Sequence, residues 1–180
     1  MTLKTAKINS LEMPNFLKHE EGALLYNAAK TAKKGIVEIG SYAGKSTIYL
    51  AQGSMDGNKV PVYCIDTWLD CEQNPDIDTF PLFKQYTEKY KETITTIKGR
   101  SEQVVDSFNK EFDVLFIDGG HEYNQVMLDW NKWAKQIKKG VVFLHDIECC
   151  AGPKKLFYSL ESLGYLTEAY GNIGRVLIGV

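Results

Sequence analysis

The sequence lacks an excess of basic residues and any long hydrophobic run, and each absence excludes a class of protein. Its 180 residues carry a net charge of −2, whereas general binders of nucleic acid or of membrane surfaces are basic. No run approaches the length that spans a membrane, and the first ten residues lack the apolar core of a signal peptide. We therefore expect a cytoplasmic protein that binds neither nucleic acid nor membrane, folded as a single domain over residues 1–180.

Cysteine is scarce, and the paired C-x-x-C spacing of structural zinc sites is absent. The four cysteines are Cys64, Cys71, Cys149 and Cys150. Cys149 and Cys150 lie near His145 in the sequence, but two adjacent thiols do not match the spacing of such sites, so zinc is not expected. Cys64 lies in an apolar run and is predicted to be a core residue.

Residues 35–47 predict a strand, a glycine turn and the start of a helix. A run rich in β-branched side chains, typical of a buried parallel strand, ends at Ile39. Gly40 and Gly44 then allow a tight turn before an amphipathic stretch that begins at Ser46. Such a turn presents backbone N–H groups at the carboxyl end of the strand. Nucleoside triphosphates, dinucleotides and S-adenosylmethionine are the ligand classes that use this geometry.

Two of these ligand classes fit the spacing poorly. Residues 44–47 resemble the end of a Walker A loop, but the two glycines enclose three residues where that motif has four. Ser41 and Tyr42 lie where the dinucleotide fingerprint G-x-G-x-x-G has its second glycine. Glu38 would repel phosphates, whereas it suits a ligand with a positive charge or free hydroxyls. A P-loop-like phosphotransferase and a cofactor-binding module without catalysis remain alternatives.

Hydrophobic patterning predicts alternating strands and helices after a helical lead-in over residues 1–30, whose helix covers 14–30. Strands are expected at 36–39, 60–65, 93–97, 112–117 and 141–144, with two terminal strands near 165–170 and 175–180. Helices are expected around 47–53, 104–108, 126–137 and 156–163. Phe83, Tyr86 and Tyr90 are spaced as one helical face that packs in the core. Five βα units followed by a hairpin predict a mostly parallel α/β sheet with helices on both faces.

Polar residues stand at or just after the carboxyl end of every expected parallel strand. In such a sheet these ends meet at one edge, where ligands bind. A single Asp or Ser at such a position is common turn chemistry, but all five strands share the feature. The residues are Glu38, Gly40, Asp66, Ser101, Asp118, His121, His145 and Asp146.

Five strings carry a resemblance to a known family and cover nearly the whole chain. They are residues 36–47, 63–66, 99–101, 116–123 and 140–146, of which the segment I-D-G-G-H-x-Y is the most specific. The chain resembles a small class I S-adenosylmethionine-dependent methyltransferase, of the group that includes macrolide-sugar O-methyltransferases and relatives of cephalosporin hydroxylase. The resemblance implies a Rossmann-like three-layer sandwich with sheet order 3-2-1-4-5-7-6 and an antiparallel last strand. It also implies methyl transfer, with S-adenosyl-L-methionine as cofactor, to an oxygen of a small hydroxylated acceptor such as a sugar or natural product.

Candidate cofactor-binding residues follow from these positions. Asp66 is placed to accept hydrogen bonds from both ribose hydroxyls, and a turn cap is its alternative role. The glycine loop would approach the methionine portion, and Glu38 would fix that loop or reach the ammonium through water. Lys45 is expected to face solvent. The full set is Glu38, Gly40, Ser41, Gly44, Asp66, Thr67, Trp68, Ser101 and Asp118.

Trp68 and Ser101 also have alternative roles. Thr67 or Trp68 would flank the adenine, although Trp68 equally suits the core. Ser101 resembles the position near the adenine amino group, and it would alternatively cap the helix that follows.

The candidate catalytic residues are Asp118, His121 and His145. Asp118 and Asp146 match positions that hold magnesium in metal-dependent relatives, but His145 stands where some of these enzymes have a second acid. A site of Asp118, Asp146 and His145 for magnesium or another divalent metal is therefore left open. Neutral imidazole is available as a general base near neutral pH, and we favour His145 over His121 because it follows a core strand directly. The alternative is that His121 caps a helix and His145 is structural.

Little of the chain is available to cover a substrate. Residues 1–30, the aromatic segment 67–92 and the loop 147–153 are the candidates for a lid. A site with so few walls is often completed by a neighbouring subunit, so a homo-oligomer is expected. The sequence does not identify the small-molecule acceptor.

Overall fold

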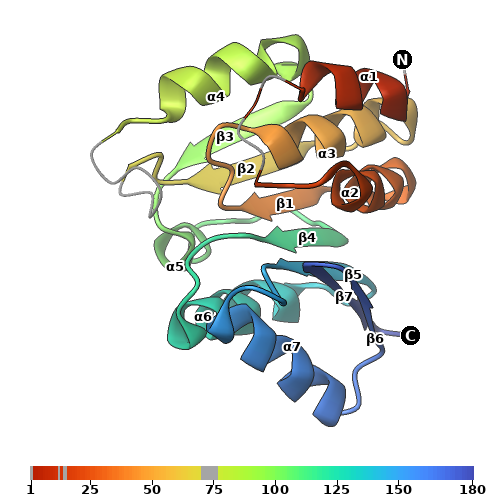
Figure 1. The fold of residues 1–180 in the computed structure, drawn as a ribbon, viewed down its shortest axis with the longest axis vertical. Helices are drawn as coiled ribbons and strands as arrows, with labels where there is room; N and C mark the ends of the chain where they lie inside the picture. The colour runs from red at the N-terminus through yellow and green to blue at the C-terminus, as the bar shows by residue number, and fades with distance from the viewer. Residues whose placement is uncertain (1, 12, 14–15, 70–76) are drawn as a thin grey trace.

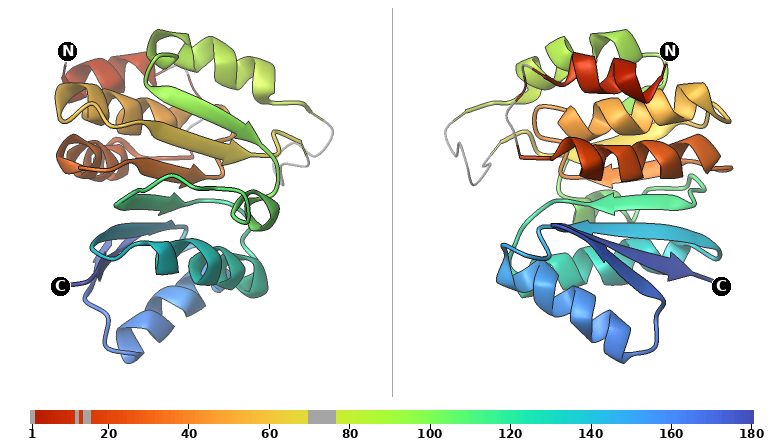
Figure 2. Two further views of the ribbon diagram at one scale, coloured as in Figure 1. Left: turned by 180° about the vertical axis from the view of Figure 1, so that it is seen from behind. Right: turned by 45° about the vertical axis from the view of Figure 1, so that its right-hand side comes forward.

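A mixed sheet of seven strands, with helices on both faces, forms the centre of the molecule (Figures 1 and 2). The structure is a computed structural model that describes residues 2–11, 13, 16–69 and 77–180. The strands are β1 (Ile36–Ile39), β2 (Val62–Asp66), β3 (Ile94–Lys98), β4 (Val114–Ile117), β5 (Gly140–His145), β6 (Thr167–Tyr170) and β7 (Ile173–Ile178). The helices are α1 (Leu3–Asn9), α2 (His19–Thr31), α3 (Lys45–Asp56), α4 (Phe80–Thr87), α5 (Ser101–Val104), α6 (Tyr123–Trp133) and α7 (Ala151–Ser162), with 3-10 turns η1 (Glu88–Tyr90) and η2 (Ala134–Gln136).

The sheet order is β3-β2-β1-β4-β5-β7-β6, as the resemblance implied. Strands β1 to β5 run parallel to one another, and β7 pairs antiparallel with both β5 and β6. The predicted Rossmann-like three-layer sandwich is therefore confirmed. Because β1 to β5 are parallel, their carboxyl ends lie along one edge of the sheet.

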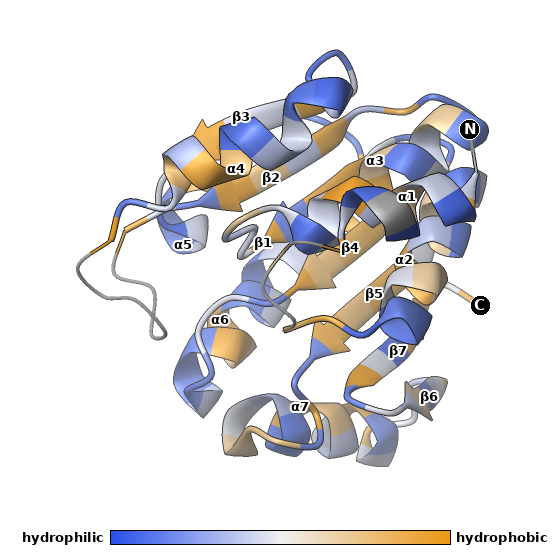
Figure 3. Cartoon of the chain, turned by 45° about the horizontal axis from the view of Figure 1, so that its top comes forward, coloured by the Kyte–Doolittle hydropathy of each residue, from blue (hydrophilic) through white to orange (hydrophobic). Residues whose placement is uncertain are grey.

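Alternation along the strands separates the core into two layers. In β1, Ile36 belongs to the layer that α1 to α4 cover, whereas Val37 and Ile39 belong to the layer beneath α6 and α7. The hydrophobic residues follow the strands through the middle of the molecule (Figure 3). Among the described residues, no helix combines the length and apolar character needed to cross a bilayer.

The N-terminal lead-in differs from the prediction. The structure has two helices instead of one, and α2 begins at His19 because Glu21 caps the backbone N–H of Lys18 at 2.8 Å. Pro14, the expected start, lies outside the described residues. The aromatic segment also divides, since Phe83 lies in α4 whereas the buried Tyr90 ends the 3-10 turn η1.

Candidate active site

A cavity of about 570 Å³ lies at the carboxyl ends of the parallel strands. Its volume falls in the range of small-molecule sites. The structure brings together most of the residues that the strand ends predicted. Those that line the cavity are Gly40, Ser41, Asp66, Thr67, Ser101, Asp118, His121, His145 and Asp146.

Positive backbone φ angles mark the loops that form this cavity. Tyr42, Trp68 and Asp146, which follow β1, β2 and β5, have φ of 45°, 54° and 61°. Side chains other than glycine rarely adopt this region, and such strain is concentrated at functional sites.

Gly40 permits the ends of β1 and β4 to meet. Its φ is +87°, and a Cβ atom there would lie 2.0 Å from the carbonyl oxygen of Asp118. Only glycine avoids both the strained φ and this clash. The turn therefore brings Ser41 and Asp118 to the same cavity.

Glu38 lies beneath the glycine loop, and it does not line the cavity. Its buried carboxyl group accepts hydrogen bonds from Ser41 Oγ at 2.7 Å and from Thr47 Oγ1. Burial raises the pKa of Glu38. These hydrogen bonds show that Glu38 holds the glycine loop in place. Its contact with the cofactor stays a prediction. Gly44 likewise precedes α3 without lining the cavity.

Asp66 joins the end of β2 to the glycine loop. Its two carboxylate oxygens accept the backbone N–H of Tyr42 at 2.7 Å and of Trp68 at 2.6 Å. The turn-capping role is therefore present. A carboxylate has about four acceptor positions, so ribose hydroxyls are compatible with these two bonds.

Trp68 belongs to the core, one of the two roles predicted for it, and it does not line the cavity. Its side chain is buried, and its ring packs against Phe80 and Phe83 with centroids 4.7 and 5.0 Å away. The indole N–H donates to the carbonyl oxygen of Tyr42 at 3.0 Å. Thr67, the other predicted residue, does line the cavity.

Ser101 pairs with a carboxyl group that the sequence did not single out as functional. It is the first residue of α5, with Arg100 at the N-cap position, so the predicted capping role of Ser101 is wrong. Its hydroxyl donates to Asp129, whose buried carboxyl group has its pKa raised to about 6 by burial. Asp129 is the only charged residue on the buried face of α6, and this is the signal that would have identified it.

Lys45 is partly buried and lines the cavity, where the sequence predicted a residue facing solvent. Burial lowers the pKa of its ammonium group. The first turn of α3 therefore turns Lys45 toward the ligand space.

His145 lies among three carboxyl groups at the end of β5. Its Nδ1 is 3.1 Å from Asp118 Oδ1 and 3.3 Å from Asp146 Oδ1, and its Nε2 is 3.6 Å from Glu21 Oε2. Burial by itself would lower the pKa of His145, but the charge of Asp118, the hydrogen bond to Asp118 and the nearby carboxyl groups of Asp146 and Glu21 raise it to about 12. This cluster of carboxyl groups favours the protonated imidazole over the neutral base that the sequence predicted.

Glu21 is a member of this group that sequence reasoning missed. An acid in the first turn of a helix is usually explained by the helix dipole, and Glu21 does also accept the Lys18 N–H. Its burial beneath the sheet edge became visible only with the fold.

His121 lies at the cavity wall between β4 and α6. Its Nε2 is 2.8 Å from Asp146 Oδ2, and 22% of its side chain is exposed, compared with 2% for His145. Burial would raise the pKa of Asp146, but hydrogen bonds to His121 and His145 hold that pKa well below its usual value. His121 therefore faces an ionised carboxylate and is the more accessible of the two histidines.

The fold and this edge of the sheet can be compared with known proteins. Residues 37–147 match a family model described as a methyltransferase domain. The chain belongs to this methyltransferase family. The resemblance to class I S-adenosylmethionine-dependent methyltransferases is confirmed, and a phosphotransferase is not favoured.

One similar curated protein methylates carbon according to its name. It is the "Probable cobalt-precorrin-6B C(15)-methyltransferase (decarboxylating)" of Sulfurisphaera tokodaii, 26% identical over 147 residues. The match covers 81% of this methyltransferase and 67% of that protein.

Similar solved structures include two that hold S-adenosylhomocysteine (SAH). An O-methyltransferase from Bacillus cereus in complex with SAH has a TM-score of 0.64 at 19% identity, over 97% of this chain and 90% of that one. MycE methyltransferase of the mycinamycin biosynthetic pathway, in complex with Mg, SAH and mycinamycin VI, has a TM-score of 0.65 at 16% identity. That match covers 98% of this chain but 53% of MycE. At these identities the structures show a shared fold.

Proposed function

We propose that this methyltransferase transfers the methyl group of S-adenosylmethionine to an oxygen of a small hydroxylated acceptor, with His121 as general base. The observation that carries the proposal is the pairing of His121 Nε2 with the ionised Asp146 at 2.8 Å, at the wall of the cavity. A carboxylate in this position orients an imidazole and stabilises its protonated form. We assign the base role to His121 and not to His145, because His121 is more exposed and His145 lies buried among three carboxyl groups that favour its protonated form.

The cofactor's sulfonium supplies an activated methyl group. The chain has to bind the cofactor, align the acceptor with it and remove the acceptor's proton. We assign the methionine portion to the backbone of 40–41, the ribose to Asp66 and the adenine end to Ser101. His121 would then take the acceptor's hydroxyl proton at its second ring nitrogen, while Asp146 stabilises the resulting imidazolium. Aligning acceptor oxygen, methyl carbon and sulfur is the remaining contribution of the cavity walls.

The donor atoms of Asp118, His145 and Asp146 lie within 4.8 Å of one another, and they could hold a divalent cation if His145 first gave up its proton. Two carboxylates suit magnesium, whereas the imidazole is a poorer ligand for it. When bound, such an ion would lower the pKa of an acceptor hydroxyl. Activity in excess EDTA tests whether the reaction needs it.

The choice of oxygen as acceptor atom is supported by the solved O-methyltransferases and opposed by the curated relative, whose name gives a carbon. A panel of sugars, phenols, hydroxylated natural products and activated carbon acids separates the two. Methylated product from hydroxyl compounds alone supports the proposal, and product from carbon acids alone contradicts it.

His121→Gln tests the base directly. We expect its kcat to fall by about 10²–10⁴-fold, the usual contribution of a general base, with SAH affinity within about twofold. His19→Gln is the matched control, because His19 is outside the cavity and contacts Tyr49 Oη at 3.0 Å. Wild-type turnover by His121→Gln with a true acceptor would exclude His121 as the base.

A further inference from the structure

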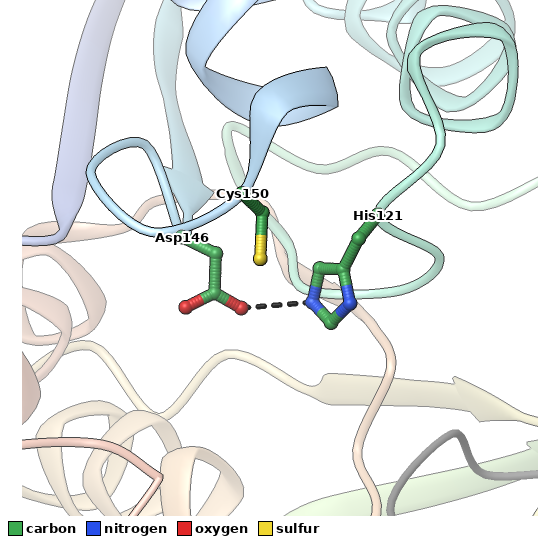
Figure 4. Close-up of side chains that lie close together, drawn as sticks. All are labelled: His121, Asp146 and Cys150. Carbon is green, nitrogen blue, oxygen red and sulfur yellow. Dashed lines mark ion pairs between the residues drawn. The ribbon is translucent and has the colours of Figure 1, made fainter.

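A nitrogen, an oxygen and a sulfur ligand atom meet at the wall of the cavity. They belong to His121, Asp146 and Cys150, and they lie within 4.8 Å of one another. Figure 4 shows the three side chains pointing toward one space, with His121 from the loop before α6 and the other two from the loop before α7. All three are partly buried and line the cavity.

This donor set differs in chemistry from that of Asp118, His145 and Asp146. Imidazole, thiolate and carboxylate are the ligands of zinc, and three protein ligands with an open fourth position are typical of zinc sites that bind a small molecule. With ordinary bond lengths, two ligands of a tetrahedral zinc ion lie about 3.3–3.7 Å apart. The 2.8 Å between His121 Nε2 and Asp146 Oδ2 therefore needs only a small side-chain movement to admit the ion.

The surrounding residues hold these ligands in place. Asp146 has φ of 61°, and its Oδ1 accepts a hydrogen bond from Asn172 Nδ2 at 2.6 Å, which directs Oδ2 toward His121. Gly152 allows the start of α7 to approach the loop before α6, since a Cβ there would lie 2.1 Å from the His121 carbonyl oxygen. Partners that orient ligating groups in this way support metal affinity.

We propose that this protein binds one borderline-soft divalent cation, of which Zn²⁺ is the type, through His121, Asp146 and Cys150. The spacing of the cysteines did not predict this zinc site. Its imidazole comes from a loop that is distant in the sequence, so no local motif indicates the ligand set.

Cobalt titration of the full-length, reduced protein tests the site without any assay of activity. We expect one equivalent of Co²⁺ to bind with a sulfur-to-cobalt charge-transfer absorption in the near-ultraviolet. Zn²⁺ should abolish this absorption by displacement, and a large excess of Mg²⁺ should not. A cobalt spectrum without the sulfur band, or release of Co²⁺ by Mg²⁺, would overturn the proposal.

Cys150→Ser tests the ligand assignment. Serine is a favourable residue at the N-cap position that Cys150 occupies before α7, so the fold should be kept. We expect loss of the charge-transfer band and a Zn²⁺ affinity weakened by at least about 10–100-fold. Cys149→Ser and Cys71→Ser are the matched controls and should keep the band.

His121→Gln keeps the thiol and removes the nitrogen ligand, so it should weaken Zn²⁺ binding by a similar factor. Loss of the band in Cys149→Ser with its retention in Cys150→Ser would contradict the proposed ligands. Because every readout is metal binding, a failure here leaves the role of His121 in methyl transfer to its own kinetic test.

Discussion

At the scale of single residues, burial and close charges decide which groups around the cavity are ionised. The pKa of Asp129 is raised to about 6, whereas that of Asp146 is held well below its usual value. The difference follows from partners, since Asp129 faces a hydroxyl group and Asp146 faces two imidazoles. Because the pKa of Asp129 is raised in the folded chain, this residue should make the unfolding free energy depend on pH.

We expect the unfolding free energy of the ligand-free protein to fall between about pH 4 and pH 6 through Asp129. Its pKa is about 6 in the folded chain and 3.8 as the ordinary value, so the folded chain binds more protons over this interval. Stability from this group is thus lost as pH rises. Asp129→Asn removes the effect, and it should raise the unfolding free energy at pH 7.5 by up to about 3 kcal/mol.

Urea unfolding at several pH values measures this change. The control is Asp106→Asn, because the Asp106 side chain is 77% exposed. Equal pH dependence in Asp129→Asn and wild type would contradict the assignment.

At the scale of elements, the site depends on close approaches between loops and helix starts. The first turn of α7 lies against the backbone of the loop that carries His121, and Gly152 is the residue at that contact. The packing of two elements thereby positions the proposed base and the proposed metal ligands together.

We expect Gly152→Ala to move α7 and the His121 loop apart. The added methyl group would lie 2.1 Å from a backbone oxygen, which no side-chain rotation relieves. Overpacking of this kind costs about 1–3 kcal/mol of stability. Methyl transfer should fall with it, because His121 and Asp146 separate.

Thermal unfolding and kcat are the two measurements. Ala151→Ser, at the neighbouring exposed position, is the control. A Gly152→Ala variant with unchanged stability and activity would show that the contact does not position the base.

At the scale of the whole molecule, the cavity draws its walls from most of the parallel strands, so a ligand there stabilises the entire fold. We expect SAH at about 100 times its Kd to add about 2.7 kcal/mol of stability. For a chain of this length that corresponds to a Tm increase of about 5–10 °C. ATP with magnesium should give no increase. A thermal-shift titration with the reverse outcome would contradict a methyltransferase and favour a phosphotransferase.

The homo-oligomer that the sequence led us to expect also concerns the whole molecule, and it stays a prediction. Residues from the loop before α2, including Phe16, already contribute to the cavity rim, and a second copy would add further cover. Light scattering should give a mass above the 20.3 kDa of one chain. A mass of one chain at working concentrations would remove the expectation.

The sequence by itself was sufficient for the strands and for the edge at which polar residues gather. Apolar runs at 36–39 and 112–117 are local signals, and parallel strands necessarily bring their carboxyl ends together. The sheet order followed from the resemblance of five strings to methyltransferases. Asp66, Ser101, Asp118 and His121 could therefore be placed at this edge without a structure, and their roles there stay predictions.

Only the tertiary structure decided the orientation of Trp68, the pKa of His145 and the residues that lie beside His121. Trp68 follows β2 as a ligand residue would, but it is buried and packs against two aromatic rings of α4, those of Phe80 and Phe83. The pKa of His145 is raised because Asp118, Asp146 and Glu21 converge on it from three elements. Cys150 meets His121 only because α7 packs against the loop before α6. Periodicity and motif spacing describe neighbours along the chain, whereas a pKa and a set of metal ligands depend on neighbours in space.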